Sequence, residues 1–308
     1  QKMELSWEAG AIKLHNSVDG LIRHNVFRNT FRADHIWLDC GNENNRITGN
    51  LFLDGKEQRE AIFIECTRDG INLIDNNIIW NVEGRFDPKK IPVEPGSTGW
   101  YKMEEHDVVN GYGIYGEGTD HLRIVNNLIG NCRSAGYFAK PVSFRAEGMN
   151  RGGTSVDAKL INNIFYHCEE AAIKMPTKAN EAEGNCYVKE GGYLRILYPQ
   201  PPVCLHLPAW QEFYGFDLHG QEAWFDVDVD TEKLTFTCKK AAKKPFAFPG
   251  ELEKRNFVFE PEKTRSVDAS ALIQADFYGI EIENGRCLPG PFAELDPNRI
   301  YDIDPRKK

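Results

Sequence analysis

The chain has 308 residues, of which 41% are hydrophobic and 27% are charged, and its formal net charge is −9 at pH 7. This composition is typical of a folded protein that is long enough to bury a substantial core. The acidic balance argues against nucleic acid as a partner, because surfaces that bind phosphates are usually basic. No apolar run approaches the roughly 18 residues that cross a bilayer, and no signal-peptide pattern is present, so we expect no membrane partner either.

Similar pairs of predicted strands recur along the first 80 residues. In each pair, the side chains of the first strand alternate between two faces and the strand ends in His, Asp or Glu. The second strand has a central Asn. The pairs are 11–15 with 21–27, 35–39 with 47–52, and 61–65 with 74–79. Asn50 and Asn77 lie 27 residues apart, a period typical of solenoids, in which each coil buries its apolar side against its neighbours. The first coil would leave its core open, so we expect an upstream segment or a partner chain to cover it.

Strand alternation places one acid of each coil on the outer face. In the strand 35–39, Ile36 and Leu38 point to one face, whereas Trp37 and Asp39 point to the other. The strand 61–65 repeats this pattern with Glu65 in the place of Asp39. Stacked strands lie about 4.8 Å apart, which suits the roughly 5–5.5 Å between the carboxyl groups of a retaining glycosidase better than the about 6.5–9.5 Å of an inverting one. We therefore predict that Asp39 and Glu65 are catalytic residues.

A third acid and a long insertion follow in the next coil. Glu117 ends the strand expected at 112–117 and falls in the register of the two acids. The insertion at 83–110 contains Trp100 and His106, and a loop of this length in a compact protein is more often functional than idle. We expect it to form one wall of a cleft and these three side chains to contact the substrate.

The central Asn recurs in six predicted coils. We expect its amide to hydrogen-bond to the next Asn and to the backbone, at a corner where Asn also tolerates the left-handed conformation. These residues are Asn25, Asn50, Asn77, Asn127, Asn163 and Asn185.

The eight cysteines form no CxxC pair and no zinc-finger spacing, so no metal site is predicted. Cys40 and Cys66 each follow an acid of the pair, and strand alternation turns both inward. We expect them to be buried thiols that pack as small hydrophobic side chains and form no disulfides.

The neighbours of the two acids suit a sugar. Trp37 offers an apolar face to a pyranose ring, although it can also pack on the aromatic residue of the next coil. Lys13, His15 and Arg68 can donate hydrogen bonds to hydroxyl groups. Glu8, just upstream of the first strand, can reach the same surface.

The stretches that carry these residues resemble one enzyme family. They are 7–15, 36–39, 46–52, 63–65 and 75–77. Together they are similar to the catalytic region of family-120 glycoside hydrolases, which are β-xylosidases on a right-handed parallel β-helix that act with retention. The resemblance implies that Asp39 is the nucleophile and Glu65 the acid/base, with Glu8, Lys13 and His15 near the sugar. The inserted β-sandwich domain of those enzymes has no counterpart in this sequence.

These patterns predict the fold class and the domains. We expect an all-β fold, a right-handed parallel β-helix, with its coils in residues 1–190. Residues 207–211 can open a short helix and 224–236 alternate like an edge strand, but Pro-rich segments surround them. Residues 191–308 are therefore expected to be a mostly irregular C-terminal extension that packs on or caps the coils.

Two other functions are compatible with these residues. One is a polysaccharide lyase or epimerase, in which Asp39, Glu65 and Glu117 would hold Ca²⁺. The other is a non-catalytic protein that binds glycans or has a structural role. The favoured prediction is a hydrolase without a cofactor, whose partner is an oligosaccharide or polysaccharide substrate of neutral, plant type.

Overall fold

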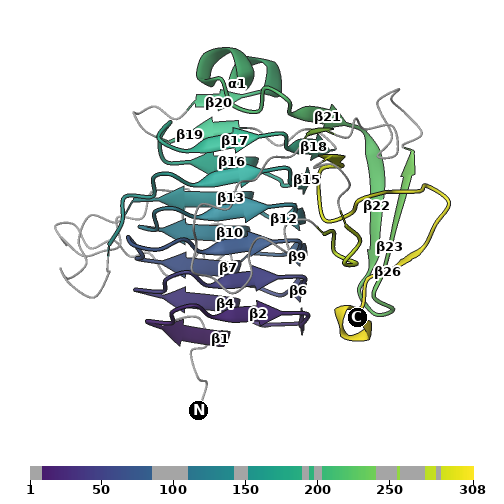
Figure 1. The fold of residues 1–308 in the computed structure, drawn as a ribbon, viewed down its shortest axis with the longest axis horizontal. Helices are drawn as coiled ribbons and strands as arrows, with labels where there is room; N and C mark the ends of the chain where they lie inside the picture. Colours follow the sequence, from purple (N-terminus) through teal and green to yellow (C-terminus); the bar gives the residue numbers. More distant parts are fainter. Residues whose placement is uncertain are drawn as a thin grey trace.

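A computed structural model describes residues 9–84, 110–141, 152–188, 194–197, 203–240, 255–256, 275–281 and 286–308. Within these residues, three long sheets enclose one core, and the chain enters each of them in turn (Figure 1). Their strands are parallel except for the last strand of the first sheet, which pairs antiparallel with its neighbour. We call one strand from each sheet, taken in chain order, a rung. The second rung, for example, consists of β4 (Asp34–Asp39), β5 (Arg46–Thr48) and β6 (Leu51–Gly55).

The strands of each sheet follow one another in rung order. The first sheet contains β1 (Gly10–His15), β4, β7 (Glu60–Glu65), β10 (Tyr112–Glu117), β13 (Ala135–Lys140), β16 (Ala171–Met175), β19 (Leu194–Ile196) and β20 (Val203–Leu205). The second contains β2 (Leu21–Arg23), β5, β8 (Leu73–Asp75), β11 (Arg123–Val125), β14 (Lys159–Ile161) and β17 (Glu181–Glu183). The third contains β3 (Val26–Arg28), β6, β9 (Ile78–Val82), β12 (Leu128–Cys132), β15 (Ile164–Tyr166), β18 (Cys186–Val188) and β21 (Gln221–Ala223). The cover expected for the β1 end remains a prediction.

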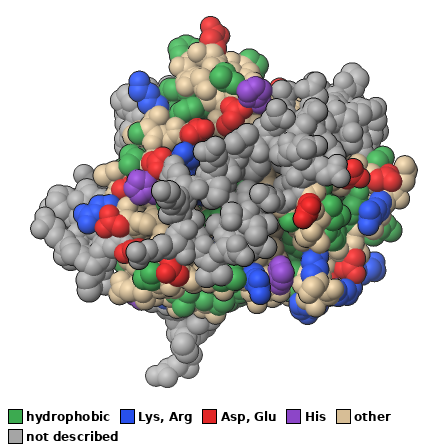
Figure 2. Space-filling model, in the orientation of Figure 1, with side chains coloured by type: hydrophobic (Ala, Val, Ile, Leu, Met, Phe, Trp, Pro, Cys, Tyr) green, Lys and Arg blue, Asp and Glu red, His purple; other side chains and the backbone are tan. Residues whose placement is uncertain are grey.

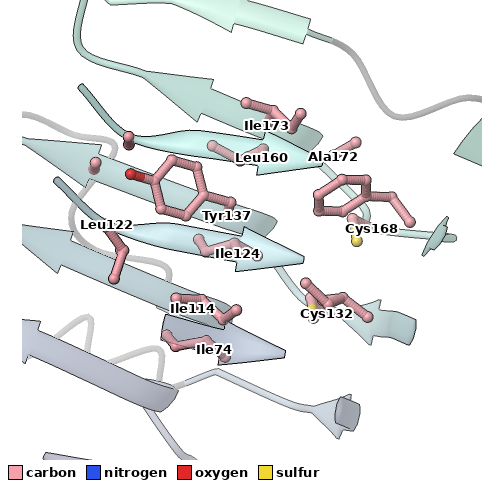
Figure 3. Packing of buried hydrophobic residues seen from close by; sticks show 14 of the residues in the cluster. Ile74, Ile114, Leu122, Ile124, Cys132, Tyr137, Leu160, Cys168, Ala172 and Ile173 are labelled. Atoms are coloured by element: carbon pink, nitrogen blue, oxygen red, sulfur yellow. The ribbon is translucent and has the colours of Figure 1, made fainter. Parts of the chain in front are cut away.

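Apolar side chains that alternate along the strands fill the space between the three sheets. Ile36 and Ile62 pair in register on β4 and β7, and both are fully buried in this core. Figure 3 shows how Ile114, Ile124 and Leu160 continue the core in later rungs. Because side chains alternate along a strand, the residues between these positions point to the opposite face of the first sheet, which is where the candidate site lies.

A row of Asn side chains joins the rungs at one corner. The backbone N–H and the Nδ2 of Asn50 donate to Oδ1 of Asn77 at 2.9 and 3.1 Å. Asn77 donates in the same way to Oδ1 of Asn127, at 2.9 and 3.0 Å. The expected amide network is thereby confirmed, with one difference: the left-handed residue is the one before the Asn, such as Asn76 with φ 52°.

The row ends on a carboxylate that the sequence analysis did not single out. Oδ1 of Asp217 accepts hydrogen bonds from the backbone N–H and Nδ2 of Asn185, at 3.0 and 2.8 Å. Its Oδ2 accepts from the Tyr187 hydroxyl at 2.6 Å and from Nε1 of Trp210 at 3.2 Å. Burial raises the pKa of Asp217 to about 6, although the hydrogen bonds from Tyr187 and Asn185 act to lower it.

Helix α1 (Leu207–Tyr214) closes the core at the end of the stack, beyond β19 and β20 (Figure 1). Pro208 lies in its first turn, where the missing N–H has no intrahelical partner to lose. Gly215 ends the helix in the left-handed conformation with φ 68°. Trp210 is fully buried in the same core as the residues between the sheets. No helix in the described parts of the chain is long and apolar enough to span a membrane.

An antiparallel sheet covers the outer face of the third sheet. It consists of β22 (Phe225–Asp230), β23 (Thr235–Lys240) and β26 (Tyr301–Asp302). Phe225 and Phe236 share an apolar cluster with Trp80 and Ile164 of the third sheet. The remaining elements are the pair β24 (Arg255–Asn256) and β25 (Arg286–Cys287) and the 3₁₀ helix η4 (Pro305–Lys307).

The predicted fold class, an all-β right-handed parallel β-helix with a mostly irregular C-terminal extension, is wrong. The described residues form three long parallel sheets together with one α-helix that belongs to the same core. The extension contains a regular antiparallel sheet, because the alternating residues 225–230 pair with 235–240 instead of forming a single edge strand. The boundary expected at residue 190 remains a prediction.

The substitution Asp217→Asn is expected to change how stability depends on pH. The folded state holds the Asp217 proton up to about pH 6, whereas an unfolded Asp releases it near 3.9. The protonated carboxyl therefore contributes stability below pH 4, and this contribution, about 3 kcal/mol at most, is lost as the pH rises through 6. Urea unfolding of the wild type and of Asp217→Asn between pH 4 and 7 gives the free energy of unfolding at each pH. If this free energy depends on pH in the same way in both proteins, the raised pKa of Asp217 is contradicted.

Candidate active site

The outer face of the first sheet carries two rows of side chains that run across the rungs. We call Trp37, Phe63, Tyr115 and Phe138 the aromatic row; they are register partners on β4, β7, β10 and β13. We call Asp39, Glu65 and Glu117 the carboxylate row, and it lies two residues further along the same strands. Register pairing extends this second row to His15 at one end and to Lys140 at the other.

The aromatic row is a continuous stack. The ring centroids of Trp37 and Phe63 lie 5.2 Å apart, those of Phe63 and Tyr115 4.9 Å apart, and those of Tyr115 and Phe138 5.1 Å apart. The ammonium group of Lys13 lies 3.6 Å from the Trp37 centroid, a cation–π contact. Phe63 and Lys13 thus occupy the two faces of the Trp37 ring, so a sugar would meet this residue at its edge.

Asp39 lies between two basic side chains. Its Oδ2 is 3.0 Å from Nζ of Lys13 and 3.4 Å from Nε2 of His15, and the carboxylate is 11% exposed. Burial acts to raise its pKa, but hydrogen bonds from the Cys40 thiol and Lys13, with the charges of Lys13 and His15, hold the pKa below its usual value. Asp39 is therefore ionised at neutral pH.

Glu65 is more deeply buried, with 3% of the residue exposed. Nε1 of Trp37 donates a hydrogen bond to its Oε2 at 3.0 Å. Its Oε1 lies 3.9 Å from Sγ of Cys66. The aromatic row therefore fixes one oxygen of this carboxyl, while the other oxygen faces a thiol.

The remaining predicted site residues differ in their placement. Glu117 lies in the carboxylate row with Oε1 3.8 Å from Nζ of Lys140. Arg68 is exposed in the loop after the strand, and it forms an ion pair with Asp69 at 3.4 Å. The predicted contacts Glu8, Trp100 and His106 lie outside the described residues.

The two cysteines that follow the acids were not expected in the site. Cys40 and Cys66 are buried thiols, as predicted, but they lie outside the apolar clusters of the described residues. Both have φ 46°, in the left-handed region, so the strand alternation that would turn them inward no longer holds. Their position directly after each acid is the only sequence signal for this arrangement.

The left-handed conformation of Cys40 and Cys66 places their thiols in two groups of possible metal-ligand atoms. In the described parts of the chain, His15, Asp39 and Cys40 form one group and Cys40, Glu65 and Cys66 form the other, with all ligand atoms of a group within 4.8 Å of one another. Both groups contain sulfur, whereas Ca²⁺ prefers oxygen ligands. The three carboxylates that the lyase alternative would use for Ca²⁺ do not form such a group among these residues.

A second carboxyl pair at the start of the same strands was also missed. Asp34 and Glu60 are 4% and 0% exposed, and Arg59 lies 3.1 Å from Oε1 of Glu60. Burial raises the pKa of both carboxyls, and the charge of Glu60 raises that of Asp34 further. This pair is more enclosed than the carboxylate row and is separated from it by the aromatic row.

Comparison with known proteins supports the fold. No family model matches the chain, and no curated protein matches it. The chain is similar to a solved structure described as the complex of XylC with xylose, with a TM-score of 0.55 and 15% sequence identity. The similarity covers 96% of this chain but only 44% of that one, so this chain spans less than half the length of XylC. At this identity the similarity establishes a shared fold.

Lys13→Met is expected to raise the pKa of Asp39. The substitution removes an ammonium group 3.0 Å from the carboxylate and keeps a long side chain over the Trp37 ring. Burial then continues to raise the pKa, without the hydrogen bond and charge that lower it. Carboxyl ¹³C NMR, with Asp39→Asn to assign the resonance, measures the change.

Lys140→Met is the matched control, because it removes an ammonium group from the opposite end of the row, beside Glu117. The Asp39 titration is expected to stay as in the wild type. An Asp39 pKa that is unchanged in Lys13→Met would contradict the electrostatic account of this site.

Proposed function

We propose that this protein is a retaining glycoside hydrolase that acts on a neutral glycan, with a β-xylosidase-like specificity. Asp39 is the proposed nucleophile and Glu65 the proposed acid/base. The observation that carries the proposal is the register pairing of Asp39 and Glu65 on adjacent parallel strands, both on the outer face of the first sheet.

The spacing supports retention. Adjacent strands lie about 4.7–4.9 Å apart, and retaining glycosidases separate their carboxyl groups by roughly 5–5.5 Å. An inverting enzyme places a water molecule between its carboxyl groups and needs about 6.5–9.5 Å. Asp39 and Glu65 are neighbours in the carboxylate row, so their spacing fits the shorter separation of a retaining enzyme.

The surroundings of the two acids support different roles. Asp39 is held by Lys13 and His15, which favour the carboxylate that a nucleophile requires. Glu65 is oriented by the indole N–H of Trp37 and is the less exposed of the two acids. A carboxyl group in such an enclosed position suits the transfer of a proton to the leaving group.

The reaction then takes two steps. An oxygen of Asp39 attacks the anomeric carbon, and Glu65 donates its proton to the glycosidic oxygen as that bond breaks, which leaves a glycosyl ester on Asp39. In the second step Glu65 removes a proton from water, which attacks the anomeric carbon and releases Asp39. Two inversions at this carbon give net retention.

The character of the substrate is inferred from charge and from similarity. The net charge of −9 disfavours an anionic polymer. On the face seen in Figure 2, the described Lys and Arg side chains are interspersed with Asp and Glu and form no broad basic area. XylC, which shares the fold, was solved with xylose, and this supports a xyloside as the first substrate to test.

We expect the protein to hydrolyse an aryl glycoside from a panel that starts with β-xyloside, α-L-arabinoside and α-L-fucoside. Asp39→Ala is expected to lower kcat/KM by at least about 10³-fold, because it removes the nucleophile. Glu65→Ala is expected to lower it by about 10²–10⁴-fold for poor leaving groups, and by much less for a nitrophenolate that leaves without protonation. Azide should restore turnover in Asp39→Ala and give a glycosyl azide.

Glu57→Gln is the matched control, because Glu57 is a half-exposed acid paired with Arg32 and lies outside both rows. It should keep the wild-type rate. If neither Asp39→Ala nor Glu65→Ala lowers turnover of a substrate that the wild type cleaves, the proposed roles are wrong.

A further inference from the structure

Cys40 and Cys66 occupy a backbone position that disfavours them. The residue after each of the first four strands of the first sheet is left-handed, and the values of φ are 53° at Asn16, 46° at Cys40, 46° at Cys66 and 57° at Gly118. Asn and Gly adopt this conformation readily, whereas other residues do so at a cost. In the two rungs that carry Asp39 and Glu65, this left-handed position is therefore occupied by cysteine, although Asn or Gly would adopt the conformation at lower cost. This indicates that the thiols have a function.

The backbone stacks these two thiols on adjacent rungs. The N–H of Cys40 donates to the carbonyl of Glu65 at 3.0 Å, and the N–H of Gly41 donates to the carbonyl of Cys66 at 3.3 Å. The Sγ atoms of Cys40 and Cys66 and a carboxylate oxygen of Glu65 all lie within 4.8 Å of one another. Three donors of two kinds, from two rungs, thus converge on one point.

We propose that Cys40, Glu65 and Cys66 bind a thiophilic divalent cation such as Zn²⁺. A tetrahedral zinc ion with Zn–S near 2.3 Å and Zn–O near 2.1 Å separates its donors by about 3.4–3.8 Å. Oε1 of Glu65 and Sγ of Cys66 are already 3.9 Å apart, so small side-chain movements complete the geometry. Both thiols bind as thiolates, and their two protons are released to solvent.

The second donor group provides a route to this site. Cys40 also lies within 4.8 Å of donors on Asp39 and His15, and the His15 side chain is 43% exposed. A cation can therefore bind first to His15 and Asp39 and then move to the buried thiols of Cys40 and Cys66. Either of these two side chains can supply the fourth ligand.

Another pair of stacked cysteines provides an internal comparison. Cys132 and Cys168 lie among apolar side chains between the sheets (Figure 3). The hydrogen bond that the Cys132 thiol donates to Cys168, together with burial, raises the pKa of Cys132 well above that of an ordinary thiol. No carboxylate or imidazole belongs to this pair in the donor groups of the described residues, so it should not bind the cation.

Binding would also switch off the reaction proposed above, and this consequence rests on that function. A cation on Glu65 leaves the carboxyl unable to donate or accept the proton of the glycosidic oxygen. Zn²⁺ should then inhibit hydrolysis, and a chelator should restore it.

The test uses the full chain and the metal alone, without a glycoside. Co²⁺ added to the wild type should give a thiolate charge-transfer absorption that saturates at one equivalent, and Zn²⁺ should displace it. Cys40→Ser with Cys66→Ser should remove the absorption and weaken Zn²⁺ binding by more than about 100-fold, since even outer partners of a metal are worth roughly 10–100-fold. Glu65→Gln, which leaves both thiols in place, should weaken binding by more than about 10-fold.

Cys132→Ser with Cys168→Ser is the matched control and should bind Co²⁺ as the wild type does. No charge-transfer absorption in the wild type, or one that survives in the Cys40 and Cys66 variant, overturns the proposal. Loss of the absorption in the Cys132 and Cys168 variant alone overturns it as well. Since no glycoside is used, failure here leaves the hydrolase proposal intact, and a protein without hydrolase activity can still bind the metal.

Discussion

The candidate site depends on one constraint, the in-register pairing of parallel strands in the first sheet. This pairing brings equivalent positions of successive rungs within about 4.8 Å of each other, so residues far apart in the sequence become neighbours in a row. Ile36 and Ile62 hold the register, because a slip of one residue would turn these buried side chains outward. The pairing of Asp39 with Glu65 follows from the same register.

A row of like charges on neighbouring strands is unfavourable, and basic side chains at the two ends of the carboxylate row offset the repulsion. Lys13 and His15 contact Asp39 at one end of the row, and Lys140 lies near Glu117 at the other. Trp37 connects the two rows, since it stacks in one and donates its N–H to Glu65 in the other. Trp37 therefore positions Glu65, and the other rings of the aromatic row stack behind it.

Much of the site could be predicted because side-chain alternation has a period of two and the same strand pattern recurs along the chain. Alternation and register predict that Asp39, Glu65, Glu117 and His15 share one face, and the structure pairs these four in register with Lys13 beside Asp39. The cysteines could not be placed by alternation, because a single left-handed residue at the end of each strand turns its side chain aside. The sequence left two alternatives open for Trp37, contact with a sugar or stacking on Phe63, and the cross-strand geometry shows the stacking.

In the C-terminal region, the eight-residue helix and the antiparallel sheet have a weaker sequence pattern than the repeated strands. Their formation depends on contacts with the core and with the third sheet, which the local sequence does not reveal.

The most direct test of the central claim is to trap the covalent intermediate. An activated 2-deoxy-2-fluoro-β-xyloside, or the fluoro analogue of whichever glycoside is cleaved, should inactivate the protein and add one sugar per chain. Peptide mass spectrometry should locate that sugar on Asp39, and Asp39→Ala should not be labelled. A sugar on a different residue, or an α-configured first product seen by ¹H NMR during cleavage of a β-glycoside, would contradict the account.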